Sequence, residues 1–379
     1  MFEIPQNAKM SSASVSAPIH KPVLKVMGMG GGGGNAVDRM MELGLQGVEF
    51  ITANTDRQVL ERSQAPVKIQ LGPKATRGLG AGGHPEVGQT AAEESWKEIA
   101  DALSGADMVF LTAGMGGGTG TGSIPVAAKI AKKLGAVTIA VVTTPFSFEM
   151  GRRQHNAMEG LNKLHQHVDT LITIPNDRLL FVAPQHLPLD TAFRLADDVL
   201  RQAVQGITEL ITEPGLINVD FAHIRRLMKL GGGALMAIGH GNGEDKALKA
   251  VKQALNHPLL ESVSLQNAAG VIANFTAGND LALAEVCEAL DYIQQQAHPQ
   301  TEIVMGTIQN PNMENRVQVI LVITGLGAPT LEDVIPGSEQ IQAKPDAIEH
   351  RTLVKPVAPV SANNLDLPAF LRRQSHVTG

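Results

Sequence analysis

Glycines are the residues of this 379-residue chain whose arrangement most clearly suggests chemistry. The run Gly114–Ser123 reads GMGGGTGTGS and lies between an apolar stretch, Met108–Ala113, and a helical pattern that begins near Pro125. At such a turn, uncovered backbone N–H groups can surround an anion, and the positive end of the helix adds to the attraction. Since Ser123 can cap this helix, Pro125 suits its first turn and Gly135 can end it, we predict a phosphate site rather than a flexible linker.

A second glycine run, Gly28–Gly34, follows the apolar stretch Val23–Met27 and precedes a helix that we expect after Asn35. It contains the G-x-G-x-x-G spacing of dinucleotide-binding proteins, so a dinucleotide-dependent enzyme is one interpretation. Two observations count against that class. The glycine run at Gly114 is surplus to a single pyrophosphate site, and no acidic residue is clearly placed for the ribose. A Walker-type site is excluded because no G-K-[ST] follows a glycine run.

Four further polar loops follow stretches that resemble strands. Together they supply backbone donors for phosphates, Asn and Glu side chains for ribose hydroxyls, and one Arg. Each loop taken alone could be an ordinary turn, because Asn, Asp, Gly and Pro are common in turns. Their occurrence at successive strand ends favours one nucleotide site. The loops are Asn54–Asp56, Thr76–Pro85, Pro145–Arg153 and Pro175–Asp177.

Strands and helices alternate from Lys21 onward, which predicts a parallel sheet with helices on both faces. Ligands of such sheets bind at the carboxyl ends of the strands, where these loops fall. Asp190–Thr212 has one apolar face and predicts a single helix roughly 30 Å long. The predicted strands are Val23–Met27, Phe50–Ala53, Met108–Ala113, Val137–Thr143 and Leu171–Ile174, and those of a second α/β unit are Ala234–Ile238, Gly270–Thr276, Glu302–Thr307 and Val317–Thr324.

The composition narrows the class of protein. Aromatic residues make up 3% of the chain and its net charge is −6 without a basic stripe, so we expect no nucleic-acid partner. Cys287 is the single cysteine, which excludes an internal disulfide. No apolar run is long enough to cross a bilayer, and residues 1–20 do not form a signal peptide. We therefore expect a cytoplasmic protein with no direct membrane insertion and no metal bound by protein ligands.

The segment Gly116–Gly122 reads GGGTGTG, the signature of tubulins, and the chain from about Lys21 to Leu326 resembles FtsZ, the family of bacterial tubulin-like cell-division GTPases. The resemblance implies an α/β fold with a tubulin-like parallel-sheet nucleotide-binding domain, a long central helix and a second, smaller α/β domain. It also implies a cytoskeletal GTPase that forms head-to-tail filaments in the cytoplasm at the division site during septation. Its other motifs occur in family order at Gly30–Ala36, Asn54–Asp56, Thr76–Gly88, Pro145–Arg153, Ile174–Asp177 and Asn218–Asp220.

The resemblance also implies how GTP or GDP would be bound, with Mg²⁺ held mainly through the phosphates. Glu149 and Arg153 would flank the ribose and phosphates, Asn176 would face the nucleoside, and Phe193 would stack on the base. Asp197 falls at the position that reads guanine, since a carboxylate can accept from both the ring N–H and the exocyclic amine. The pattern alone would make Phe193 a core residue and Asp197 a solvated one. The residues implied to cradle the phosphates are Gly31, Gly32, Gly33, Gly34, Asn35, Ala81, Gly82, Gly83, Gly116, Gly117, Gly118, Thr119 and Gly120.

One motif departs from the family pattern. Relatives complete the active site with a loop of the neighbouring subunit that reads Asn-x-Asp-x-x-Asp, and this chain has Asn218, Asp220 and His223 there. Loss of the second acid would weaken hydrolysis, because phosphoryl transfer depends on positioning and electrostatics. His223 could instead accept a hydrogen bond from water, with a pH-dependent effect, or simply pair with Asp220 at a helix start. A non-hydrolysing structural or regulatory paralogue that co-assembles with another family member is therefore an alternative.

The end of the chain resembles the family's partner-binding peptide. That peptide would recruit membrane-tethering and regulatory division proteins, with apolar side chains buried in a groove of the partner. Its residues are Leu365, Asp366, Leu367, Pro368, Phe370, Leu371 and Arg372. The expected organisation is a disordered extension (1–20), a GTP-binding domain (21–189), the central helix with the lead-in to the shared loop (190–215), a C-terminal α/β domain (216–328), a flexible linker (329–362) and the peptide (363–379).

Overall fold

The computed structural model describes residues 21–149, 151–181, 188–213, 215, 217, 219–260 and 264–326. The expected N-terminal extension, the linker, the C-terminal peptide and Asn218 lie outside these residues. Within them, no helix is both long and apolar enough to cross a membrane.

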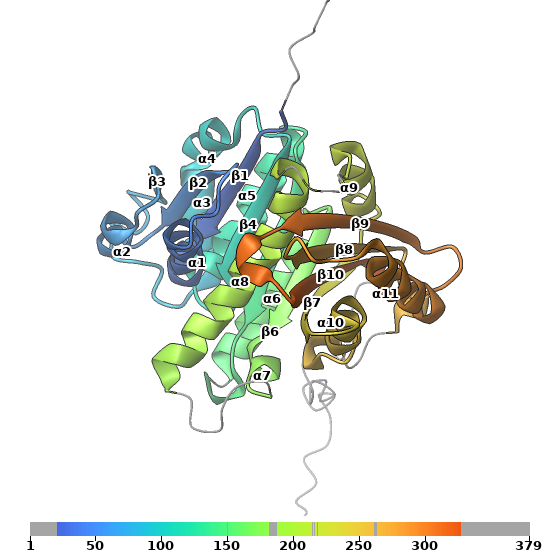
Figure 1. Cartoon of the computed structure of the whole chain (residues 1–379). Coiled ribbons are helices and arrows are strands. Elements are labelled where there is room, and N and C mark those ends of the chain that lie inside the picture. Colours follow the sequence, from blue (N-terminus) through green and yellow to red (C-terminus); the bar gives the residue numbers. More distant parts are fainter. Residues whose placement is uncertain are drawn as a thin grey trace, which may run out of the picture. The chain divides into compact units, whose positions relative to one another are not determined.

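A single ten-stranded sheet runs through the described chain in the order β3-β2-β1-β4-β5-β6-β7-β10-β8-β9 (Figure 1). Its first six strands are parallel, which confirms the predicted parallel sheet. β3 alone among them was not predicted, because its four residues, VKIQ, include two polar ones and form no continuous apolar run. These strands are β1 (Leu24–Met29), β2 (Glu49–Asn54), β3 (Val67–Gln70), β4 (Met108–Gly114), β5 (Val137–Thr144) and β6 (Thr170–Pro175).

The second half of the sheet is mixed. β7 continues the parallel half through two residue pairs with β6, Leu171–Gly233 and Ile172–Ala234. β10 is antiparallel to both β7 and β8, whereas β9 is parallel to β8. All four strands predicted for the second α/β unit are present. They are β7 (Gly233–Asn242), β8 (Gly270–Ala277), β9 (Glu302–Gln309) and β10 (Arg316–Leu326).

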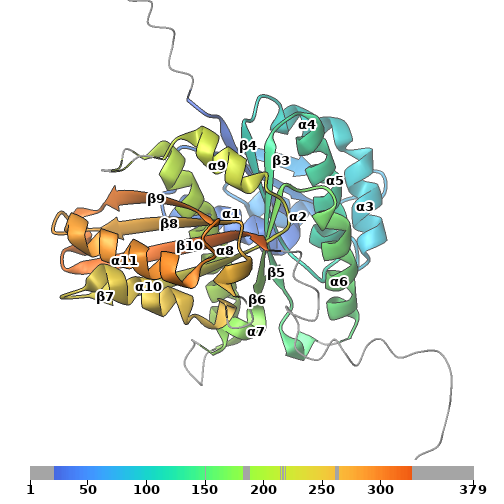
Figure 2. The same ribbon diagram turned by 90° about the vertical axis from the view of Figure 1, so that its right-hand side faces the viewer.

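Helices cover both faces of the sheet (Figure 2). On one face of the parallel half, α1 (Gly30–Glu42), α8 (Leu189–Thr212) and α9 (Phe221–Met228) share a core with the strands. On the opposite face lie α3 (Pro85–Glu94), α4 (Trp96–Leu103), α5 (Thr119–Lys133) and α6 (Arg152–His165). The short helix α2 (Arg57–Arg62) begins after the turn Thr55–Asp56 that follows β2, and the short helix α7 (Asn176–Leu179) follows β6 directly.

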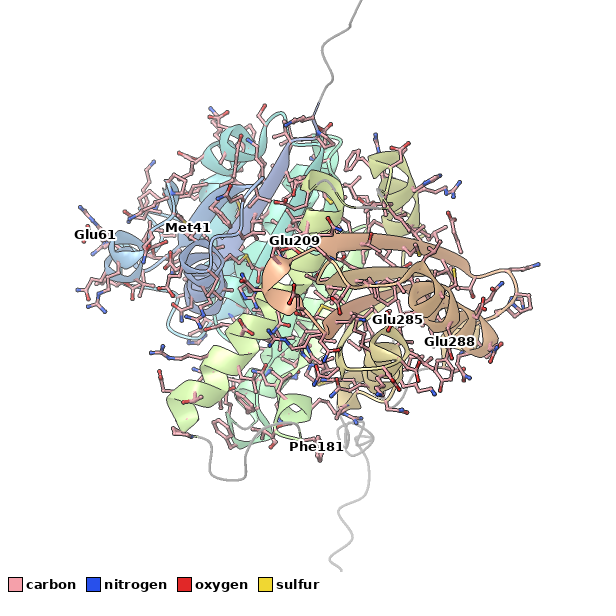
Figure 3. All side chains as sticks on the ribbon, in the orientation of Figure 1. Met41, Glu61, Phe181, Glu209, Glu285 and Glu288 are labelled. Carbon is pink, nitrogen blue, oxygen red and sulfur yellow. The ribbon has the colours of Figure 1, made fainter. Side chains whose placement is uncertain are left out.

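In the second half, α10 (Lys246–Leu255) and α11 (Leu283–Gln296) cover one face of β7, β8 and β10. Lys246 is almost fully buried and joins these helices through an ion pair at 3.0 Å with Glu285, which is labelled on α11 in Figure 3. The Asp280 carboxylate lies 3.4 Å from the same ammonium group. Desolvation by burial lowers the pKa of Lys246, but the two acidic partners outweigh it and the pKa is raised. The buried ammonium group therefore keeps its proton.

The central helix α8 begins one residue before the predicted Asp190 and ends at the predicted Thr212. Its buried stripe packs on the sheet, and Gly206 brings it close to β10, since an added Cβ would lie 2.8 Å from Ile320 Cδ1. At its far end an added Cβ at Gly47 would lie 2.7 Å from Thr212 Cγ2. Gly47 precedes β2, so α8 ends beside the amino ends of the strands.

Both predicted helix starts at the glycine runs were wrong. α5 begins at Thr119 rather than near Pro125, and α1 begins at Gly30 rather than after Asn35. The glycines are therefore the first helical turns, and Pro125 lies inside α5. Ser123 is not a cap: its hydroxyl donates to the Thr119 carbonyl at 2.6 Å. The end of α5 is as predicted, because Gly135 follows it with φ +85°.

Tight packing explains why glycine forms helices here. An added Cβ at Gly33 would lie 2.3 Å from the Thr112 carbonyl oxygen on β4. At Gly122 it would lie 1.9 Å from the carbonyl oxygen of Pro85, where α3 begins. Close approach of backbones offsets the low helix propensity of glycine, which sequence periodicity does not register.

Candidate functional site: a cavity at the carboxyl ends of the strands

A cavity of about 400 Å³ lies where β1, β4, β5 and β6 end, beside the N-terminal part of α8. Many of the predicted site residues meet there. Those that line it are Gly31, Gly32, Asn35, Gly117, Gly118, Thr119, Gly120, Glu149, Arg153, Asn176, Phe193 and Asp197. Met29, Met115, Thr143, Pro145 and Ala196 also line it, although the sequence analysis did not name them as individual binding residues. Their positions at strand ends or beside predicted residues were the only available signal.

The N-termini of α1 and α5 meet at this cavity. An added Cβ at Gly30, the first residue of α1, would lie 2.8 Å from Gly120 N in the first turn of α5. Gly32 approaches the end of β4 in the same way, at 3.3 Å from Gly114 N. Two helix ends with free N–H groups thus point positive partial charge at one space, which favours an anion such as a phosphate.

Several predicted phosphate residues do not line this cavity. Gly33 packs on β4, as described above. Gly34 lines an adjoining space of about 300 Å³ with Asp38 and Asn54, and Gly31 and Asn35 line both spaces. Gly116 has φ +100°, and an added Cβ would lie 2.8 Å from the Arg153 carbonyl oxygen. Glycine is therefore needed at this position for the backbone conformation of the turn and its close packing.

The loop with Ala81, Gly82 and Gly83 lies behind the first turn of α5 rather than in the cavity. An added Cβ at Gly118 would lie 2.9 Å from Ala81 Cβ. Asn156 on α6 donates to the carbonyl oxygens of Gly83 and Gly116, at 3.2 Å each. This loop therefore supports the glycine turn from outside.

The loop Asn54–Asp56 also has local structural partners. The Thr55 and Thr119 hydroxyls lie 2.6 Å apart, which fixes the start of α5 against the end of β2. Asn54 accepts from Asp56 N at 3.1 Å, and Asp56 caps α2. These contacts position the rim of the cavity.

An acidic and a basic side chain form one wall. Glu149 and Arg153 are ion-paired, and both line the cavity. Glu149 also accepts from the backbone N–H of Phe146 at 2.9 Å, which holds it in place. Arg153 is more exposed than Glu149, so its guanidinium can turn toward an anion in the cavity.

The wall formed by α7 and α8 has the features of a base-binding pocket. The Asn176 Oδ1 atom is buried with no hydrogen-bond partner, which marks an unmet acceptor. Burial raises the pKa of Asp197 to about 7, although Arg39 and Arg194 pull it down. Phe193 is 39% exposed rather than a core residue, so its ring is available to a ligand.

The predicted catalytic residues lie elsewhere. Ile217 is held to β9 by a hydrogen bond from its N–H to Thr307 Oγ1 at 3.1 Å. Asp220 then caps α9, accepting from Ala222 N at 3.0 Å, and His223 is exposed one turn on. Their side chains do not pair with each other: His223 reaches Asp220 through a backbone hydrogen bond.

The helix α8 separates this loop from the cavity. Asp197 lies in the first half of α8 and the loop follows the end of this helix, and the helical segment from Asp197 to Thr212 rises about 22 Å. In Figure 1, α9 and α7 accordingly lie at opposite ends of the view. Asp220 and His223 are therefore remote from the cavity of their own chain.

The donor set of the cavity suits a nucleotide better than a metal ion bound by protein ligands. Within the described ranges, no group of three or more His, Cys, Asp or Glu side chains comes together. The two helix N-termini, the unpaired Asn176 acceptor and the Asp197 carboxylate instead match phosphates at one end and a base at the other. The fold and this cavity define a tubulin-like nucleotide-binding protein.

Comparison with known proteins gives the family. The model of the Tubulin/FtsZ family, GTPase domain, matches residues 23–184, and that of the FtsZ family, C-terminal domain, matches residues 232–327. The chain belongs to the FtsZ family of tubulin-like, filament-forming GTPases of cell division.

Solved structures agree with this assignment. An empty dimer of FtsZ from M. jannaschii is 48% identical, with a TM-score of 0.78 over 81% of this chain and 89% of that one. A point mutant of the same M. jannaschii protein has the same identity and TM-score, and the match covers 81% of this chain and 92% of the mutant chain. A protofilament of CetZ2 from Haloferax volcanii with GTPγS bound is 19% identical, with a TM-score of 0.68 over 81% and 93% of the two chains, and so shows the fold alone.

Proposed function

We propose that the cavity binds GTP, with its phosphates at the paired N-termini of α1 and α5 and its base against α8. The observation that carries this assignment is the buried, unpaired Asn176 Oδ1 beside Asp197 and Phe193. An acceptor and a carboxylate next to an aromatic ring suit the donor edge of guanine. Mg²⁺ would be held mainly by the phosphates.

We propose further that the chain assembles head to tail and that Asp220 and His223 act on the nucleotide of a neighbouring copy, with Asn218 in the same loop. Both described side chains are exposed at the start of α9 and remote from the cavity of their own chain. The dimer of FtsZ and the protofilament of CetZ2 among similar structures support self-assembly.

His223 is the reason to expect slow hydrolysis. The Asp220 carboxylate accepts from the backbone N–H of Ala222 in the first turn of α9, so its side chain is held next to the position where a second acid would stand. An imidazole is bulkier than a carboxylate and carries no negative charge in either protonation form, so it polarises an attacking water less. The alternative, a non-hydrolysing paralogue that co-assembles with another family member, rests on the same residue.

Light scattering and phosphate release, recorded together after adding GTP and Mg²⁺, test this proposal. We expect scattering to rise with GTP while phosphate appears slowly. No scattering from the pure chain at any GTP concentration would favour the co-assembling alternative. Rapid phosphate release would contradict the proposed role of His223.

We propose two further features of the chain, its division into domains and a role for its C-terminal peptide. The domain division predicted from the sequence would separate nucleotide binding (21–189) from the second α/β domain (216–328). The peptide 363–379 would recruit membrane-tethering and regulatory partners to filaments in the cytoplasm at the division site. Deleting it should leave assembly intact and abolish recruitment.

A further inference from the structure

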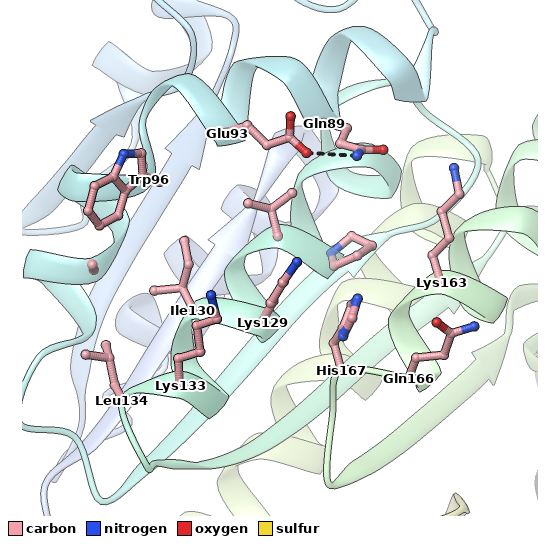
Figure 4. Close-up of a pocket in the computed structure, with 13 residues that line it drawn as sticks. Gln89, Glu93, Trp96, Lys129, Ile130, Lys133, Leu134, Lys163, Gln166 and His167 are labelled. Carbon is pink, nitrogen blue, oxygen red and sulfur yellow. Dashed lines mark hydrogen bonds between the residues drawn. The ribbon is translucent and has the colours of Figure 1, made fainter.

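A second, larger hollow lies on the face of the sheet covered by α3, α4, α5 and α6 (Figure 4). Its volume is about 700 Å³, and we call it the α3–α6 groove. Apolar side chains form much of its lining, chiefly Trp96, Val126, Ile130 and Leu134. Trp96 and Leu134 are 52% and 44% exposed, which is unusual for large apolar side chains that share one hollow.

Three lysines border the same hollow. Lys129 and Lys133 lie one turn apart on α5, and Lys163 comes from α6 (Figure 4). Within the described part of the chain none of the three makes a salt bridge, whereas the adjacent Lys132 pairs with Asp169 at 3.4 Å. The one acidic side chain in the lining, Glu93, accepts a hydrogen bond from Gln89.

The pKa of His167, at the edge of the groove, is affected by burial and by the positive charge of nearby lysines. Burial lowers its pKa, and the charges of Lys129 and Lys132 lower it further. The groove therefore combines an apolar floor with uncompensated positive charge at its border. A complementary ligand has apolar groups on one side and negative charges beside them.

We propose that the α3–α6 groove binds a short acidic amphipathic segment of a partner protein. From Val126 to Leu134 the groove follows α5 for about 12 Å, which accommodates about two turns of a helix. Leucine-like side chains would contact Trp96, Ile130 and Leu134, and flanking carboxylates would reach the lysines. A concave groove suits such a segment better than the flat surface of a bilayer.

This site is separate from the nucleotide cavity. Thr119 and Gly120 at the start of α5 line the cavity, whereas Lys129, Lys133 and Leu134 at its other end line the groove. Substitutions in the groove should accordingly leave GTP binding unchanged, which gives a control for folding.

Trp96 makes the test direct, because it is the only tryptophan of the chain. The probe is a synthetic helical peptide of about 12 residues without tryptophan, with Leu on one face and Glu and Asp on the other. Titrated into the full chain, it should shift Trp96 emission to the blue and saturate. A labelled copy should give the same Kd by anisotropy.

The matched variants are Lys129→Glu/Lys133→Glu in the groove and Lys249→Glu/Lys252→Glu on α10, which change the net charge equally. We expect the first to raise the Kd of the peptide at least tenfold and the second to leave it within twofold. Equal effects of the two pairs, or no saturable binding by the wild type, would overturn the proposal. A third outcome would also overturn it: phosphatidylserine vesicles shift Trp96 emission in a way that requires Lys129 and Lys133, while the peptide has no effect. That result would indicate a membrane as the ligand.

Discussion

The Phe193 ring meets the buried Phe146 ring edge to face, with centroids 5.5 Å apart and planes at 82°. Phe146 is fully buried and also stacks on Phe148, at 5.2 Å between centroids. Phe193 is thus held by its neighbour while it lines the cavity. A ring fixed in this way loses little freedom when a base stacks on it.

Replacing Phe193 by Ala should weaken GTP binding by about 1–3 kcal/mol, roughly 5- to 150-fold, because a stacking surface is lost. Titration calorimetry with GTP measures the change. Phe181→Ala is the matched control, since this ring is 73% exposed and does not line the cavity (Figure 3). Equal GTP affinities for the two variants would show that Phe193 does not contribute to GTP binding.

GTP affinity should depend on pH through Asp197. Its pKa of about 7 means that the carboxyl is largely protonated below pH 7 in the empty cavity. Guanine needs two acceptors, which the charged form supplies, so affinity should be highest above pH 7 and fall about tenfold per unit below it.

The Kd for GTP between pH 6 and 8.5 measures this dependence. Asp197→Asn removes the titrating group and should retain only the slope that comes from the nucleotide's own phosphates. If wild type and variant show the same slope, Asp197 does not contact the base in its charged form.

Replacing His223 by Asp should raise steady-state GTP turnover roughly tenfold or more, because a second carboxylate can orient and polarise the attacking water. His223 is exposed and its side chain has no hydrogen-bond partner in the described structure, so the change should cost little stability. Phosphate release per chain is the measurement. An unchanged rate would mean that position 223 does not limit hydrolysis.

A shared active site predicts complementation between two defective variants. Asp197→Ala should lose nucleotide binding, and Asp220→Ala should lose the loop that acts on the neighbour. Mixed in equal amounts they should recover part of the GTPase activity, since some interfaces then combine an intact cavity with an intact loop. Activity no greater than the sum of the separate variants would argue for a site within one chain.

Adjacent glycines of α1 should respond differently to alanine. Gly33→Ala places a Cβ 2.3 Å from the Thr112 carbonyl oxygen, and we expect a loss of about 1–3 kcal/mol in the free energy of unfolding. Gly34→Ala meets nothing within 4 Å and should be neutral or stabilising by up to about 1 kcal/mol. Chemical denaturation of both variants measures the difference. A similar loss for both would show that glycine itself is required at this turn.

The sequence by itself determined the class of fold and the place of the site. Alternation of apolar runs with helical patterns depends on short-range periodicity, and the observed strands and α8 follow it closely. Loops such as Asn54–Asp56 and Pro175–Asp177 fall at carboxyl ends because parallel strands share an edge. The order of the glycine motifs was enough for the family, which the comparisons confirmed.

Only the tertiary structure decided what each glycine does. Gly32 and Gly33 are identical in sequence terms, yet one lines the cavity and the other packs on β4, because the difference lies in what stands opposite the missing Cβ. The early start of α1 and α5 has the same cause. Periodicity along the chain carries no information on these contacts.

Contacts between residues that are distant in the chain could not be predicted from the sequence either. The unpaired Asn176 acceptor, the edge-to-face support of Phe193 and the groove beside Trp96 each arise from elements that are distant in the chain. The distance between the cavity and His223 follows from the length and direction of α8 across the sheet. Local patterns set the elements and their chemistry, whereas burial and distance between elements set which of those residues can act together.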